Sequence, residues 1–157
     1  MHQDTTQDTT QDTAKARTID ILLANYAESH SNPTNEIIHC ICVPAIVFSV
    51  LGLIWALHPW LATAAAVLAL TYYCTLSLSF AVGMLLMSGL MLALLVALPD
   101  GLVLPVSIEV FVLAWIGQFI GHKIEGKKPS FFDDLRYLLI GPLFVLGFLY
   151  RRLRIRY

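Results

Sequence analysis

Two short clusters of histidine, amide and carboxylate residues each lie beside a long apolar run. The first cluster is Asn35 and His39, and the second is Gln118, His122 and Glu125. Residues three or four positions apart share one face of an α-helix, so each cluster would present its polar groups together. A site of two histidines and one carboxylate with open positions suits ferrous iron and dioxygen. These residue types therefore indicate a metal site assembled from two helix ends.

A third histidine, His30, lies on the segment that leads into the first cluster. Haem b held by two histidines is an alternative, and it would require the two imidazoles to face each other across a helical bundle. An iron–sulfur or structural zinc site is not favoured, because Cys40-Ile-Cys42 lacks the spacing of a zinc knuckle or a redox pair. His58 occurs in a predicted turn between two apolar runs, and we interpret it as a residue of the membrane interface.

The composition of the chain is that of a membrane protein. Of its 157 residues, 57% are hydrophobic and 13% are charged, and the mean hydropathy is +0.71. Soluble domains carry about 25% charged residues. The net charge of -1 and the lack of a basic stripe with interleaved aromatic residues indicate no nucleic-acid partner. Gly-x-Gly-x-x-Gly, Walker and Gly-x-Ser-x-Gly patterns do not occur, so nucleotide and hydrolase chemistry have no support.

Four apolar stretches approach the length of about 20 residues that a membrane-spanning helix requires. They cover residues 37–57, 60–78, 80–98 and 102–120. A short amphipathic helix from Thr18 to Tyr26 is predicted to lie on the membrane surface. A fifth apolar stretch, 135–150, is interrupted by Gly141-Pro142. The expected fold is an all-α integral membrane protein with four transmembrane helices, a surface helix and a short C-terminal helix broken by Gly-Pro.

We expect a single membrane domain over residues 18–150, flanked by a disordered repeat tail (1–17) and a basic tail (151–157). All 10 lysine and arginine residues occur before the first span, after the fourth span or near the C-terminus. With four spans and a fifth segment that does not cross, these three groups share one face, which should be cytoplasmic. The start of the first span and the end of the fourth lie on that face. The histidines of both clusters are therefore predicted to converge there with His30.

Two longer signatures contain the candidate residues. The N-terminal signature is Tyr26-x3-His30-x-Asn32-Pro33-x-Asn35-x3-His39-x4-Pro44. The C-terminal signature is Trp115-x2-Gln118-x2-Gly121-His122-x2-Glu125-x3-Pro129, followed by Leu138-x3-Pro142-Leu-Phe144. Together they resemble the signatures of the membrane 2-hydroxy fatty acid dioxygenases, and the resemblance covers about residues 18–150. It implies an iron(II)-dependent enzyme that shortens a 2-hydroxy fatty acid by one carbon without 2-oxoglutarate.

The resemblance places the histidine ligands of the family on His30, His39 and His122. Spacing alone adds three candidates, which are Glu125 for catalysis and Asn35 and Gln118 for holding the cofactor. The implied partners are Fe(2+), dioxygen, a 2-hydroxy long-chain fatty acid and membrane lipid. The implied location is a bacterial inner membrane, or the endoplasmic reticulum of a eukaryote, with the histidines at the cytoplasmic face. The acyl chain length, the choice of iron over another metal and the oligomeric state stay open.

A non-enzymatic membrane protein is the alternative, either a small transporter or a lipid- or metal-binding protein. A transporter would favour polar residues near the membrane midplane, and only Glu109 is expected at that depth. This carboxylate could serve as a proton or ligand group, or it could pair within the bundle. A diiron lipid hydroxylase is not favoured, because that class uses more histidines than the 5 in this chain.

Overall fold

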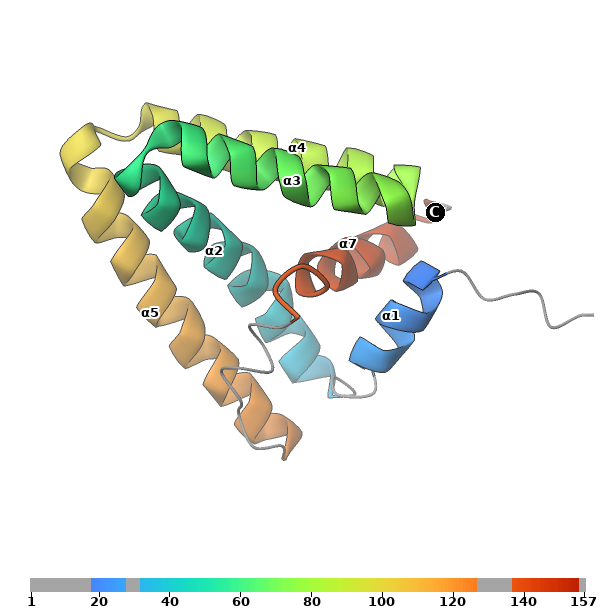
Figure 1. Ribbon diagram of the computed structural model, residues 1–157. Helices are drawn as coiled ribbons and strands as arrows, with labels where there is room; N and C mark the ends of the chain where they lie inside the picture. Colours follow the sequence, from blue (N-terminus) through green and yellow to red (C-terminus); the bar gives the residue numbers. More distant parts are fainter. Residues whose placement is uncertain (1–17, 28–31, 127–136, 156–157) are drawn as a thin grey trace, which may run out of the picture.

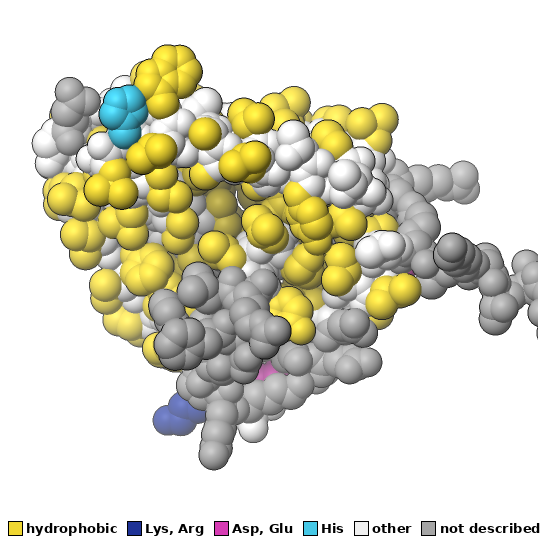
Figure 2. Space-filling view, viewed as in Figure 1, with side chains coloured by type: hydrophobic (Ala, Val, Ile, Leu, Met, Phe, Trp, Pro, Cys, Tyr) yellow, Lys and Arg dark blue, Asp and Glu magenta, His cyan; other side chains and the backbone are white. Residues whose placement is uncertain are grey.

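The computed structural model describes residues 18–27, 32–126 and 137–155. Within these residues the chain forms helices and turns without a strand, which confirms the predicted all-α fold. The helices are α1 (Thr18–Ala27), α2 (Pro33–Leu57), α3 (Pro59–Leu76), α4 (Leu78–Ala97), α5 (Asp100–Glu125) and α7 (Gly141–Arg152). Four of them, α2 to α5, are long and apolar enough to cross a membrane. Figure 2 shows hydrophobic side chains over most of the described surface in that view, as expected for a membrane protein.

Capping interactions set the ends of the two helices that carry the candidate residues. α2 begins at Pro33 rather than at residue 37, because the Asn32 side chain accepts a hydrogen bond from the Thr34 N–H at 2.9 Å. Proline fits this first turn because its missing N–H would have no helical partner there. α5 runs past the predicted end and stops at Gly126, whose φ of 77° is left-handed. Both polar clusters therefore lie on helices, one at the start of α2 and one at the end of α5.

α2 and α5 lie side by side and antiparallel, and α3 and α4 form a second pair (Figure 1). α7 packs against α2 and α4, and α1 packs against α7. Glycines bring α2 and α5 close together: a Cβ on Gly121 would overlap the Asn35 amide, and a Cβ on Gly52 would overlap the Ser107 hydroxyl. Small residues let membrane helices approach closely. These contacts hold the start of α2 against the end of α5.

The fifth apolar stretch contains a shorter helix than the sequence suggests. Pro142 lies in the first turn of α7, so Gly141-Pro142 begins this helix instead of interrupting a longer one. The 12 residues of α7 span about 18 Å at about 1.5 Å per residue. The hydrocarbon core of a bilayer is about 30 Å thick, so α7 is too short to cross it. Leu143 and Phe144 are buried in a core that also contains Phe80 of α4.

Two tyrosine hydroxyls attach the C-terminal segment to the α3–α4 pair. Tyr73 of α3 donates a hydrogen bond to the Leu139 carbonyl at 2.9 Å. Tyr150 of α7 donates to the Ser79 carbonyl at 2.8 Å. The first bond holds the turn that precedes α7 beside α3, where it also faces α2. This turn therefore lies at the centre of the molecule, close to the polar ends of α2 and α5.

Candidate active site

Two of the three predicted histidine ligands lie together where α2 meets α5. The ring centroids of His39 and His122 are 5.2 Å apart, and the ring planes are almost perpendicular, at 89°. His39 is 0% exposed and His122 is 6% exposed. The third predicted ligand, His30, lies outside the described residues. Among the residues that the structure does describe, no group of three His, Cys, Asp or Glu side chains could hold a metal ion.

Tyr26 of α1 contacts the ring of His39. The tyrosine hydroxyl lies 3.3 Å from His39 Nδ1, in a buried position. The Tyr26 ring packs against Tyr137 and Phe144, with centroid distances of 5.8 and 5.0 Å. A hydrogen bond at one ring nitrogen sets the tautomer of a histidine and orients its other nitrogen. Tyr26 therefore fixes the orientation of the His39 ring through Nδ1.

Glu125 joins the end of α5 to the start of α2. Its carboxylate accepts hydrogen bonds from the Asn32 backbone N–H at 3.0 and 3.2 Å. It also accepts a hydrogen bond from Asn35 Nδ2 at 3.0 Å. A carboxylate is favourable at a helix N-terminus, where N–H groups lack helical partners and the helix dipole is positive. These contacts give Glu125 a positioning role, because they fix the side-chain amide of Asn35.

Two amide side chains are buried next to the histidines. Asn35 lies one turn before His39 and is 0% exposed, and Gln118 lies one turn before His122 and is 2% exposed. Neither Asn35 Oδ1 nor Gln118 Oε1 has a hydrogen-bond partner within the described part of the chain. An unpaired buried carbonyl costs about 1–3 kcal/mol. The Gln118 oxygen belongs to a side chain that lines a small cavity and is suited to accept a bond from a ligand, whereas Asn35 Oδ1 lies against Gly121 of α5. Imidazole nitrogens suit iron among the first-row metals, so the buried pair of His39 and His122 fits the predicted ferrous iron.

Two other polar residues lie away from this cluster. His58 is exposed in the link between α2 and α3, where its Nδ1 accepts a hydrogen bond from the Trp60 N–H at 3.3 Å. This position is at the far end of α2 from His39. Glu109 is exposed on α5. The suggestion that this carboxylate pairs inside the bundle is therefore wrong, because its side chain faces outward.

The family model described as "2-hydroxy-palmitic acid dioxygenase Mpo1-like" matches residues 16–153 of the chain. The chain belongs to this Mpo1-like family. A curated relative from Saccharomyces cerevisiae, 2-hydroxy-palmitic acid dioxygenase MPO1, is 33% identical over 134 residues, which cover 79% of this chain and 75% of the relative. No solved structure matches the chain. The resemblance inferred from the two signatures is thus confirmed at the level of the family.

Sequence reasoning assigned no role to two residues of this Mpo1-like site, Tyr26 and Trp115. Trp115 is buried one turn before Gln118. Together with Tyr26 and Gln118 it lines a small cavity beside the histidines. Both aromatic residues begin one of the two signatures. Their position within the signatures is the signal that could have identified them, although it does not reveal which residues they contact.

Proposed function

We propose that this protein is an iron(II)-dependent dioxygenase of the membrane that shortens 2-hydroxy fatty acids by one carbon. The observation that carries the proposal is the buried contact between His39 and His122, two histidines brought together from opposite ends of the chain. Membership of the Mpo1-like family and the likeness to a protein named 2-hydroxy-palmitic acid dioxygenase support the substrate class. His39 and His122 would hold the iron together with His30.

Ferrous iron with open positions, when bound, supplies the redox chemistry that lets dioxygen react with an organic substrate. The chain itself orients the reactants. Tyr26 holds the His39 ring through Nδ1, and Glu125 holds the Asn35 amide through Nδ2. The buried oxygen of Gln118 is suited to accept a hydrogen bond from the 2-hydroxyl of the substrate. Such fixed polar contacts would keep the carbon to be oxidised in one position.

The proposed reaction balances with dioxygen as the sole oxidant. The C1–C2 bond of the 2-hydroxy acid breaks, and C2 becomes the carboxyl carbon of the shorter acid. C1 leaves as carbon dioxide, and one water forms. Four electrons pass from the substrate to dioxygen, so the reaction requires no added reductant and no 2-oxoglutarate.

The depth of the site suits an amphiphilic substrate. The 25 residues of α2 span about 37 Å, which exceeds the hydrocarbon thickness of about 30 Å. His39 lies in the second turn, close to the level at which the acid and hydroxyl groups of a membrane-bound fatty acid would rest. The exposed Lys123, which follows His122, can attract the carboxylate. We assign this end to the cytoplasm, because the basic residues of the sequence gather on the same side.

Anaerobic purification, metal analysis and oxygen uptake with a 2-hydroxy long-chain acid test the proposal. We expect iron in the protein, oxygen consumption and an acid one carbon shorter, with all activity lost after removal of iron by a chelator. The variants His30→Ala, His39→Ala and His122→Ala should lose activity. The variant His58→Ala is the matched control, because His58 is exposed at the far end of α2. Full activity after removal of iron would rule out the iron-dependent mechanism.

The alternative of a transporter receives no support from the placement of polar residues. Transporters bind their cargo near the membrane midplane, at interrupted helices. Here the buried histidines and amides lie at one end of α2 and α5, and the one carboxylate near mid-helix, Glu109, faces outward. Lack of turnover across a series of 2-hydroxy acids, combined with uptake of a metal or lipid into vesicles, would favour the transporter over the enzyme.

A further inference from the structure

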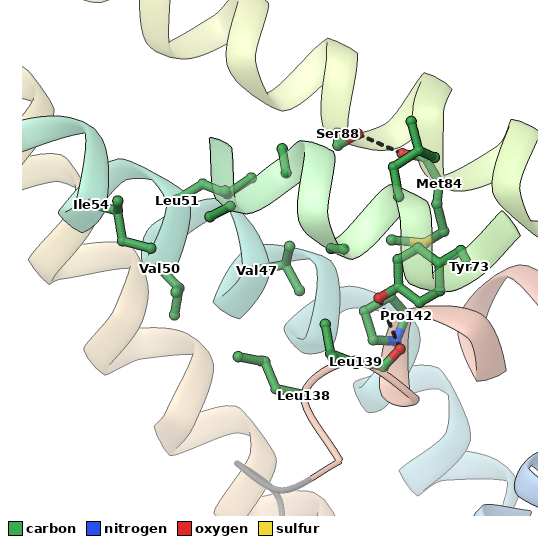
Figure 3. A pocket seen from close by; sticks show the side chains of 14 residues that line it. Val47, Val50, Leu51, Ile54, Tyr73, Met84, Ser88, Leu138, Leu139 and Pro142 are labelled. Carbon is green, nitrogen blue, oxygen red and sulfur yellow. Dashed lines mark hydrogen bonds between the residues drawn. The ribbon is translucent and has the colours of Figure 1, made fainter. Parts of the chain in front are cut away.

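An apolar cavity of about 240 Å³ lies between α2, α3, α4 and the turn that precedes α7 (Figure 3). α2 contributes the side chains of Val47, Val50, Leu51 and Ile54 to its wall. The hydroxyl groups on the wall, those of Tyr73 and Ser88, each donate to a backbone carbonyl of the protein itself. The cavity therefore presents hydrocarbon surface to any occupant, and its chemistry fits an alkyl chain.

Leu138 connects this cavity to the candidate site. Its side chain lines the large cavity and also a smaller one of about 20 Å³. The smaller cavity is lined by Tyr26, which contacts His39, and by Gln118, which lies one turn before His122. Figure 3 shows Leu138 extending from the turn to the edge of the large cavity. Leu138 thus lies between the polar site and the apolar cavity and borders both.

One face of α2 runs along the whole route. Positions 39 to 54 cover about 22 Å at about 1.5 Å per residue. A C–C bond of about 1.5 Å and an angle of about 111° advance an extended alkyl chain by about 1.25 Å per carbon. This stretch of α2 therefore matches the length of about 18 carbons. The part beside the large cavity, positions 47 to 54, corresponds to about 8 carbons.

We propose that this cavity binds the alkyl chain of the 2-hydroxy acid and that Ala65 and Ala69 of α3 set the longest chain accepted. The identity of the head group rests on the proposed function. Both alanines line the cavity. Ala69 lies one helical turn before Tyr73, whose hydroxyl holds the segment that contains Leu138. Ala65 lies one further helical turn away from that segment. The last carbons of an acid of about 16 to 18 carbons would therefore contact Ala65.

The chain-length profile of the iron-loaded enzyme tests this inference. The kcat/KM value is measured for 2-hydroxy acids of about 8 to about 20 carbons, a range chosen around the length of the route. Ala65→Leu should lower kcat/KM about tenfold for the longest acids alone, because three added carbons fill part of a space for about 8. Ala69→Leu should move the limit about 5 carbons lower, since the four residues between the two alanines rise about 6 Å. Ala64→Leu is the matched control on the exposed face of α3.

A binding experiment without turnover separates this inference from the proposed function. The probe is 2-hydroxyhexadecanoic acid with a photoreactive diazirine on its last carbon, added to the iron-loaded protein in the absence of dioxygen. We expect labels on residues 50–57 of α2 or 61–69 of α3 that decrease in the Ala69→Leu variant. If the wild-type protein turns over no 2-hydroxy acid but carries these labels, the proposed function fails and the alkyl-binding cavity stands.

Three results would overturn the alkyl-binding cavity. The first is an identical chain-length profile for the wild type and the variants Ala64→Leu, Ala65→Leu and Ala69→Leu. The second is photolabelling confined to outward-facing side chains such as Leu86, which is 70% exposed. The third is displacement of the probe by phosphatidylcholine as readily as by unlabelled 2-hydroxy acid, which would identify the cavity as a site for bulk lipid.

Discussion

Replacing Tyr26 with phenylalanine removes one oxygen atom from the candidate site and leaves the ring packing in place. The lost hydroxyl lies 3.3 Å from His39 Nδ1, whereas the ring keeps its contacts with Tyr137 and Phe144. Loss of such a partner lowers the metal affinity of a histidine site about 10- to 100-fold. Because His39 is fully buried, bulk water cannot replace the hydroxyl. We therefore expect the upper part of this range, a loss of about 2–3 kcal/mol in iron binding.

The assay is an anaerobic titration of the detergent-purified protein with ferrous iron against a chelator of known affinity. The matched control is Tyr150→Phe, which removes the same atom from a tyrosine of similar burial, 8% exposed against 6%. The Tyr150 hydroxyl donates to the Ser79 carbonyl, so the control should cost about 1 kcal/mol of folding stability. It should leave iron affinity unchanged. Equal iron affinity in Tyr26→Phe and the wild type would refute the orienting role of Tyr26.

Two further substitutions test the junction of α2 and α5. Gly121→Ala places a Cβ against the Asn35 amide and should destabilise the fold by about 1–3 kcal/mol. The control Gly89→Ala adds a Cβ that meets no atom within 4 Å and should stabilise the fold by about 0.5–1 kcal/mol. Thermal unfolding in detergent measures both changes, and a Gly121→Ala variant as stable as the wild type would contradict the close approach of α2 and α5. Glu125→Gln keeps the shape of the side chain but removes the charge from the start of α2, and should cost about 1–2 kcal/mol and reduce oxygen uptake. The same change at exposed Glu109 should leave both quantities unaltered, and equal losses in these two variants would reject the positioning role of Glu125.

The helices could be predicted from hydropathy except at the ends that carry the site. An apolar run ends at its last apolar residue, but a helix extends to the residue that caps its unpaired backbone N–H or C=O groups. The first apolar stretch begins at about residue 37, although Asn32 caps α2 and Pro33 begins it. The fourth apolar stretch ends at about residue 120, although α5 continues to Glu125. Polar residues in a functional helix end thus lower the hydropathy of turns that are nevertheless helical.

The convergence of the histidines could be predicted because it depends on topology. Four spans and one basic face bring the start of the first span to the end of the fourth, and His39 and His122 do lie in contact. The bond between Glu125 and Asn35 could not be predicted in this way, since the two residues are 90 positions apart. Spacing along the sequence reports which residues share a face of one helix. It does not report which partner that face meets, so the contact of Glu125 with α2 is seen only in the structure.

The two faces of α2 together explain how one small bundle can serve an amphiphilic substrate. Gly52 and Gly121 make close contacts between α2 and α5 near both ends of α2, so little space is left between these two helices. The face toward α3 keeps the apolar cavity, whose wall continues from Val47 to Ile54. His39 lies near the start of the same helix, in its second turn. A fatty acid aligned with α2 would therefore place its polar head at the histidines and its chain along the cavity, without leaving the depth that it occupies in the bilayer.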